Sequence, residues 1–256
     1  MHFFLLMANA MKSELRYKAN LLGVLVALVL MYSLQFVFFD VVNSLVVLEG
    51  KDKNWLMIFF VTYAVGSMVV SFFNSAITDF FGALTQGKAD MLLVRPINLM
   101  TLILFRWCEV YFIIAAVVFL GVCMVSGLIS FEPLLVSPYH TAIFCGVMVL
   151  GVLANLIFLL GLNAFSFVTQ RQLPVDYIHL SILNFALLPS TFFSNGLLYV
   201  FVTVLPMIVF ASVALDGLYN GLTGLVSVYA LVVVVCFMGV LKWVRWLFGR
   251  FNSVGG

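Results

Sequence analysis

Charged residues are scarce in this chain. Asp, Glu, Lys and Arg together make up 9% of its 256 residues, whereas a typical soluble domain has about 25%. Hydrophobic residues make up 65%, and no stretch between the apolar runs is long enough to bury a core of its own. These proportions exclude a soluble globular domain and predict an integral membrane protein. The strand-length alternation of polar and apolar residues is also missing, so the predicted fold is all-α.

The residue patterns of enzymes and metal sites are missing as well. No His-x-x-x-His, Gly-x-Ser-x-Gly or Walker lysine loop occurs. The cysteines have spacings that fit no CxxC pair, which argues against a zinc site or a disulfide framework. No basic patch is interleaved with aromatic residues, so nucleic acid is not an expected partner. The sequence therefore predicts no catalytic residue, no metal and no cofactor, and ATP hydrolysis is not expected of this chain.

Long apolar runs dominate what is present. A helix that crosses a bilayer takes about 20 residues, and the runs predict six spans, at about 21–39, 55–77, 107–130, 141–168, 177–193 and 222–244. Residues 1–20 mix apolar and charged side chains and are too short and too charged to span. They predict an amphipathic helix that lies in the interface between lipid and water. Residues 1–256 are predicted to form one transmembrane domain.

The stretch 177–212 does not fit this simple pattern, because it is too long for one span and too short for two with a turn. Pro189 and Pro206 interrupt it, and Pro interrupts the hydrogen bonding of a helix. We expect the fifth span to end at about residue 193 and residues 194–214 to form a re-entrant pair of half-helices around Pro206. Broken helices survive at membrane depth only where protein or a water-filled cavity covers their free backbone groups. The alternative is one kinked, tilted helix.

The basic residues predict the orientation. With six spans, Lys51 and Lys53 lie on one side, and every other Lys and Arg lies on the other: Lys12, Arg16, Lys18, Lys88, Arg95, Arg106, Arg171, Lys242, Arg245 and Arg250. Loops rich in Lys and Arg stay in the cytoplasm. Both termini are therefore expected to be cytoplasmic.

Few polar groups interrupt the spans. Glu109 is near the inner end of the third span, three residues after Arg106, and this spacing favours a local ion pair over a proton site. The other polar groups within the spans are amides and hydroxyls, which more often bridge helices than bind cargo: Gln35, Asn74, Ser75, Asn155, Asn163, Ser166 and Asn184. The chain thus shows no energy-coupling chemistry of its own.

One polar segment, residues 78–106, separates the second and third spans. Its charged residues do not enter lipid cheaply, Gly87 is suited to breaking a helix, and Pro96 biases the residue before it away from helical geometry. On composition alone this segment is an ordinary polar loop. The residues singled out in it are Asp79, Gly87, Lys88, Asp90, Arg95 and Pro96.

The sequence of that segment resembles a motif of the "ABC-2 family transporter protein" branch of the bacterial ABC-2-type exporter permeases. That branch carries G-x-hydrophobic-D-x-hydrophobic-L-x-R-P-hydrophobic-N between its second and third spans, and the matching residues are Gly87, Asp90, Leu93, Arg95, Pro96, Ile97 and Asn98. Residues 14–20 resemble the start of the family's first span, where Tyr-Lys-Ala-Asn replaces the usual Tyr-Arg-Ala-Asn. Residues 249–255 resemble the family's tail in part, because its tyrosine is not in the usual place.

The resemblance implies a permease of the bacterial cytoplasmic membrane that pairs with a second permease, identical or different. Two cytoplasmic ATP-binding subunits would dock beneath the pair, and the segment 78–106 would transmit their motion as a coupling segment. The cargo would be exported, and the resemblance does not name it. Two alternatives from other classes remain: an ATP-independent channel or secondary carrier, and a purely structural membrane subunit.

Overall fold

A computed structural model describes residues 2–45, 54–88, 98–127, 129–130, 132–169 and 173–249, and every regular element within those ranges is a helix. The predicted all-α fold is therefore confirmed for these residues. Four of the described helices are long and apolar enough to cross a bilayer: α2 (Lys18–Leu45), α3 (Trp55–Thr85), α8 (Pro138–Thr169) and α12 (Gly224–Gly249). At 1.5 Å per residue, each is longer than the hydrocarbon core of about 30 Å.

The other two predicted spans are shorter than expected. The third span corresponds to α6 (Tyr111–Val125), with 15 residues, and the fifth to α9 (Val175–Phe185), with 11 residues. Their lengths of about 22 Å and 16 Å do not reach across the hydrocarbon core. Length and composition therefore support four of the six predicted spans.

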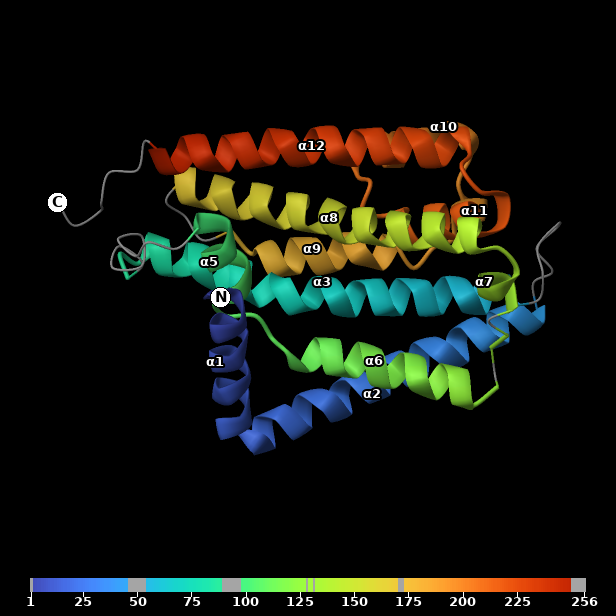
Figure 1. Cartoon of the computed structure of the whole chain (residues 1–256), viewed down its shortest axis with the longest axis horizontal. Helices are drawn as coiled ribbons and strands as arrows, with labels where there is room; N and C mark the ends of the chain where they lie inside the picture. Colours follow the sequence, from blue (N-terminus) through green and yellow to red (C-terminus); the bar gives the residue numbers. More distant parts are fainter. Residues whose placement is uncertain are drawn as a thin grey trace.

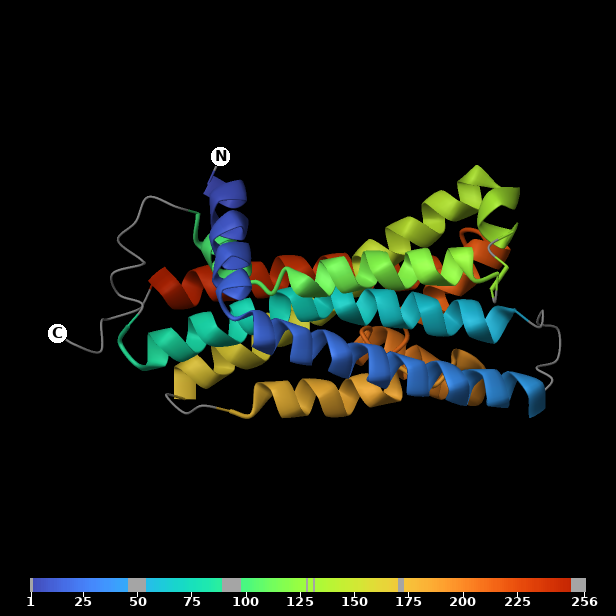
Figure 2. The ribbon, with the colours of Figure 1, turned by 90° about the horizontal axis from the view of Figure 1, so that it is seen from below.

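The helices run back and forth along one axis. Figure 1 shows α2, α3, α6, α8, α9 and α12 roughly along the long axis of the molecule, whereas α1 (His2–Arg16) lies across it. Figures 1 and 2 place α1 and α5 (Leu99–Phe105) at the end of the bundle where α12 finishes. The short helix α7 (Glu132–Val136) lies at the opposite end. The described parts of the segments predicted to share the cytoplasmic side thus gather at one end.

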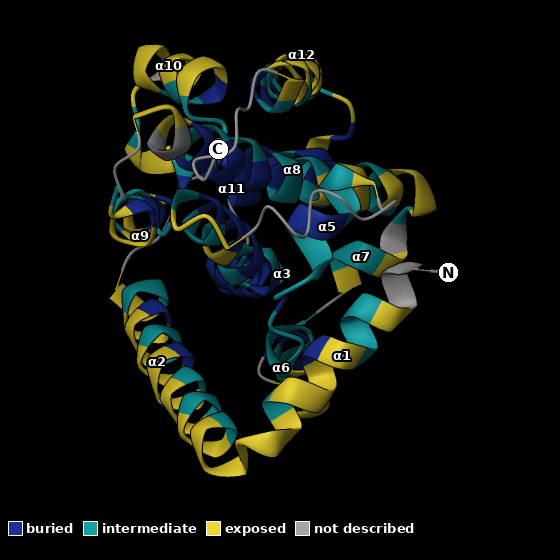
Figure 3. Ribbon diagram, turned by 90° about the vertical axis from the view of Figure 1, so that its left-hand side faces the viewer, coloured by how far each residue is buried: buried dark blue, intermediate teal, exposed yellow. Residues whose placement is uncertain are grey.

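Helix α3 forms the centre of the fold. In its most apolar window 78% of the residues are buried, compared with 6% in α2. In Figure 3, accordingly, α3 is mostly dark and α2 mostly carries the colour of exposed residues. Helices α8 and α11 (Phe210–Asn220) pack against α3 and against each other. The exposed surface of α2 is apolar, as expected of a helix that faces lipid.

The region 175–220 is broken twice. After α9 come a single 3₁₀ turn (Ser190–Phe192), α10 (Asn195–Val204) and α11. The expectation of a helix to residue 193 is wrong, because α9 ends at Phe185 before Pro189, which has no N–H and disfavours helical geometry in the residue before it. The alternative of one kinked helix is also wrong. Pro206 lies between α10 and α11, where the pair of half-helices was predicted, and α11 extends past the predicted end at residue 214, to Asn220.

The first residue of α11 locks the broken segment into the core. Phe210 is 1% exposed, and its ring lies against Gly66 of α3. A Cβ atom added to Gly66 would stand 2.5 Å from the Cε2 atom of Phe210. Ser212, also in α11, accepts a hydrogen bond of 2.9 Å from the backbone N–H of Ser190. These contacts supply protein cover for the backbone groups near the breaks, as broken helices in a membrane require.

Candidate functional site

The carboxyl end of α3 explains one of the predicted site residues. Helix α3 continues past the expected end of the second span, through Asp79 to Thr85, and Gly87 follows with a φ of +68°. The N–H of Gly87 donates to the carbonyl of Leu84, and the N–H of Lys88 donates to the carbonyl of Ala83. This pair of bonds is the Schellman motif, which places a glycine in the left-handed conformation just after a helix. Gly87 therefore ends α3.

The far end of the segment 78–106 is also built locally. Asn98, the last residue of the matched wording, is the N-cap of α5, and its Oδ1 accepts a hydrogen bond of 2.9 Å from the N–H of Met100. Leu102 and Ile103 of α5 are buried in the same cluster as Phe80 of α3. Asp90, Arg95 and Pro96 lie outside the described residues. Within this segment, α3 thus ends at the Gly87 turn and α5 begins after Asn98.

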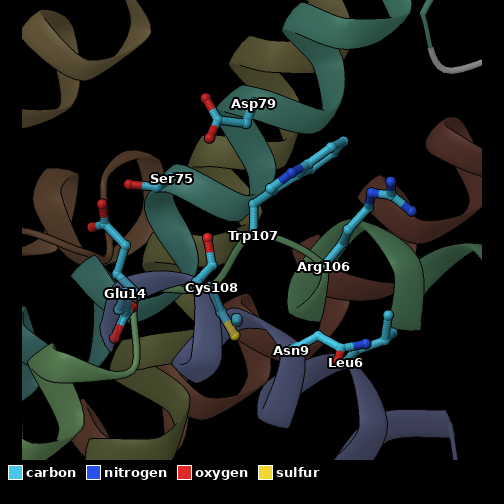
Figure 4. A pocket seen from close by; sticks show the side chains of 11 residues that line it. Leu6, Asn9, Glu14, Ser75, Asp79, Arg106, Trp107 and Cys108 are labelled. Atoms are coloured by element: carbon cyan, nitrogen blue, oxygen red, sulfur yellow. The ribbon is translucent and has the colours of Figure 1, made fainter. Parts of the chain in front are cut away.

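Asp79 lies away from these two helix ends, at a polar cavity. It lies on an exposed part of α3, at a polar cavity of about 440 Å³ between α1, α3 and the connection from α5 to α6. Figure 4 shows Asp79 and Ser75 on α3 above this space, with Glu14 and Asn9 of α1 on its other sides. Ser13 of α1 also lines the cavity, together with Arg106, Trp107, Cys108 and Glu109 of the connection. The structure therefore brings Asp79 near Glu14 and Glu109, and sequence spacing did not predict this grouping.

Glu14 makes a contact over a long distance in the sequence. Its Oε1 accepts a hydrogen bond of 2.7 Å from the backbone N–H of Val110, 96 residues away, at the start of α6. Burial raises the pKa of the Glu14 carboxyl above its ordinary value, the backbone N–H groups of Val110 and Tyr111 act in the lowering direction, and the charge of Glu109 raises it further. Residues 14–20 were singled out only because their sequence resembles a family motif. No local pattern in that motif identifies Val110 as a partner of Glu14.

The ion pair expected between Arg106 and Glu109 rested on helical spacing, which the structure does not provide. Residues 106–110 form the break between α5 and α6. The guanidinium carbon of Arg106 lies 4.6 Å from the centre of the Trp107 ring, within the range of a cation–π contact. The Glu109 N–H donates to the carbonyl of Phe72 on α3 at 3.2 Å. Glu109 thus ties the connection to α3.

The comparisons with known proteins agree with the resemblance found in the sequence. A family model described as "ABC-2 family transporter protein" matches residues 28–253. The chain belongs to this family. No curated protein and no solved structure matched the chain.

Membership identifies this ABC-2 family transporter protein as the membrane component of a transporter, embedded in the bilayer by several spans. Such a component is not itself catalytic, and the family works with an ATP-binding partner. In the part of the chain that the structure describes, no three His, Cys, Asp or Glu side chains are grouped as a metal site requires.

Other polar side chains of this ABC-2 protein hold its short helix α9 in place. Asp176, at the start of α9, accepts hydrogen bonds from Asn74 at 2.9 Å and from Thr78 at 3.2 Å, both on α3. One turn further, His179 lies 3.2 Å from the Oδ1 of Asn155 on α8, and both side chains are buried. The prediction that amides bridge helices is thus confirmed for Asn74 and Asn155. These hydrogen bonds join α9 to α3 and to α8.

A second, apolar cavity of about 530 Å³ lies between α2, α3 and α6. It is lined mainly by aliphatic side chains of α2 and α6, with Met68 of α3. Tyr32 of α2 also lines it, and its hydroxyl is paired with that of Ser67 on α3 at 2.9 Å. The cavity separates α2 from α6 over part of their length and leaves α2 attached mainly through α3.

Proposed function

We propose that this chain is the permease subunit of an ATP-driven exporter of the bacterial cytoplasmic membrane. It pairs with a second permease, identical or different, and two cytoplasmic ATP-binding subunits dock on the pair. The observation that carries the proposal is the family match over residues 28–253, which includes most of the chain. The family match does not identify the cargo.

The proposed docking region is the coupling segment within residues 78–106. Helix α3 reaches this segment without a break from the centre of the bundle, ending at the Schellman turn of Gly87. A push on the segment would therefore move the most buried helix directly. On the other side of the segment, α5 packs on α3 and on α1. This arrangement supports a role in transmitting motion from the ATP-binding subunits to the bundle.

The membrane placement follows the same proposal. Helix α1 lies across the bundle and leaves Leu5, Met11 and Leu15 exposed, which suits a helix in the cytoplasmic interface. Both termini face the cytoplasm. Helices α10 and α11 form the re-entrant pair around Pro206, and both lie in the half of the molecule away from α1 (Figure 1). The re-entrant pair would then approach the bundle from the outer side.

The test is to purify the tagged chain from its native membrane and to measure ATP hydrolysis in lipid nanodiscs. An exporter permease should bring down an ATP-binding subunit in stoichiometric amounts, and the complex should hydrolyse ATP faster than that subunit alone. Purification of the folded chain without any ATP-binding subunit would contradict the proposal and favour a channel, a secondary carrier or a structural subunit.

A further inference from the structure

The amino terminus of α6 has no cap from its own sequence. The first N–H groups of any helix lack partners within the helix and need an acceptor from elsewhere. Here the N-cap position is held by Val110, whose side chain has no oxygen to offer. The residue that supplies the acceptor is Glu14, through the 2.7 Å bond from the Val110 N–H to its Oε1. A carboxylate at this position also meets the positive end of the helix dipole.

Helix α1, which carries Glu14, contacts the coupling segment through α5. Helix α1 packs against α5, which Asn98 begins at the end of the coupling segment. Ala10 of α1 is buried in one cluster with Phe72 and Ala76 of α3 and Cys108 of the connection to α6. Helix α1 therefore lies against α5 on one side and holds the start of α6 through Glu14 on the other. Figure 4 shows this wall of the cavity, with Glu14 on one side and Arg106 on the other.

We propose that Glu14 is a positioning residue, which caps α6 from α1 so that α1 and the inner end of α6 move together when the coupling segment moves. This inference rests on the proposed function for the motion, and on the contact of Glu14 with Val110 for the cap. Motion of α5 then reaches α6 by two routes, through the connection 106–110 and through α1. Helix α1 thereby links the coupling segment to α6.

The first measurement tests whether Glu14 caps α6, and it needs neither cargo nor ATP. It is hydrogen exchange of the Val110 and Tyr111 amides in the full chain in lipid nanodiscs, for wild type, Glu14→Ala, Glu14→Gln and Ser13→Ala. Loss of the acceptor in Glu14→Ala should speed exchange about fivefold or more, as expected for a lost helix cap. Glu14→Gln keeps an amide oxygen that accepts the bond, so its exchange should stay near wild type. Ser13→Ala, which changes the same cavity wall without touching the cap, should match wild type. Unchanged exchange in Glu14→Ala would overturn the proposal.

The second measurement decides the transmission, and uses the chain together with its ATP-binding partner. ATP and vanadate trap the closed state of the ATP-binding subunits, and exchange is compared with the nucleotide-free complex. In wild type, trapping should alter exchange in both α5 and the start of α6. Glu14→Ala should keep the change in α5 and weaken the change in α6, because only the route through the connection 106–110 remains, and Glu14→Gln should restore it. An intact α6 response in Glu14→Ala, or an equal loss in Glu14→Gln, would overturn the positioning role. A wild type that does not respond to ATP at all would count against the proposed function, while the first measurement still decides the cap.

Discussion

A methyl group added to Gly151 of α8 would stand 2.7 Å from the Cβ atom of Phe210. Phe210 opens α11, and Gly66 of α3 meets the same ring from the other helix. The two glycines thus form a notch between α3 and α8, into which one aromatic ring fits. Small residues that let helices approach closely are a common way to pack helices in membranes, where burial of apolar surface contributes little.

The notch makes a direct prediction about stability. Gly151→Ala should lower the free energy of unfolding by about 1–3 kcal/mol, because the Cβ atom of Phe210, and with it the start of α11, must shift to admit the methyl group. Thermal unfolding in detergent micelles is the measurement. Gly161→Ala is the matched control, since it lies on the same helix and its added Cβ atom meets nothing within 4 Å. Equal midpoints for the two variants would contradict the packing described for Phe210.

Membrane orientation gives the second prediction. In a background without the four native cysteines, single cysteines placed near Lys51, Ser137 and Tyr219 should react with a membrane-impermeant maleimide added to intact cells. Cysteines near Lys88 and Arg171 should react only after the membrane is opened. The reason is the concentration of Lys and Arg on one side of the predicted map. Strong labelling near Lys88 in intact cells would reverse that map.

Pro206 gives the third prediction. Pro206→Ala restores a backbone N–H in the break between α10 and α11, and it removes the constraint that keeps the two helices apart. We expect normal insertion into the membrane but a clear fall in ATP hydrolysis by the complex with its ATP-binding partner. Thermal unfolding of the purified variant separates this effect from misfolding. Wild-type hydrolysis, with residues 205–209 open to lipid-soluble labels, would argue against a re-entrant pair.

The proposed coupling segment gives the fourth prediction, which rests on the sequence because Arg95 lies outside the described residues. Arg95→Ala should leave the chain inserted but weaken the docking of the ATP-binding subunit about tenfold, as loss of a hydrogen bond to a charged group does. Co-purification and ATP hydrolysis measure the effect. Lys242→Ala removes a positive charge near the same predicted side and serves as the control. Full docking by Arg95→Ala would reduce the segment to an ordinary polar loop.

The pH dependence of stability gives the fifth prediction. Burial holds the pKa of Glu14 above its ordinary value of 4.5. A carboxyl with a raised folded-state pKa contributes stability that is fully present below its unfolded pKa and is lost as the pH rises through the folded pKa. Wild type should therefore lose stability relative to Glu14→Gln as the pH rises from about 4.5, in thermal unfolding followed across that range.

The same comparison has a clear contrary result. The other titratable or charged groups around the cavity are Asp79, Arg106, Cys108 and Glu109, and all four are present in both proteins, so the difference between them isolates Glu14. Above the folded pKa, Glu14→Gln should be at least as stable as wild type, because it keeps the acceptor without the buried charge. A variant that is less stable than wild type at neutral pH would show that the charge itself stabilises this contact.

The sequence predicts the parts of this fold that depend on local chemistry. Long apolar runs identify α2, α3, α8 and α12, because twenty apolar residues have few alternatives to a membrane span. Gly87 and Pro206 mark breaks for reasons that belong to single residues, and both breaks are where they were expected. The ends of α9 and α6 were misjudged, because apolar composition continues past the point where each helix stops.

Contacts between distant segments were beyond sequence reasoning. The pairing of Glu14 with Val110 joins residues 96 apart, and that of Asn74 with Asp176 joins residues 102 apart. Neither residue of the first pair has a spacing or motif that identifies the other. For Arg106 and Glu109 the sequence suggested too much. Their spacing would suit neighbours on one helix, but these residues lie in the connection between two helices.

The place of Phe210 also bears on how the protein is made. Helices α10 and α11 have 10 and 11 residues, too few to be inserted into a bilayer as spans on their own. Each must be received by protein that is already there. Helices α3 and α8 both precede α11 in the chain, so the notch of Gly66 and Gly151 is synthesised before the ring that fills it. Biogenesis from the amino terminus onward thus prepares the receiving surface before α11 is made.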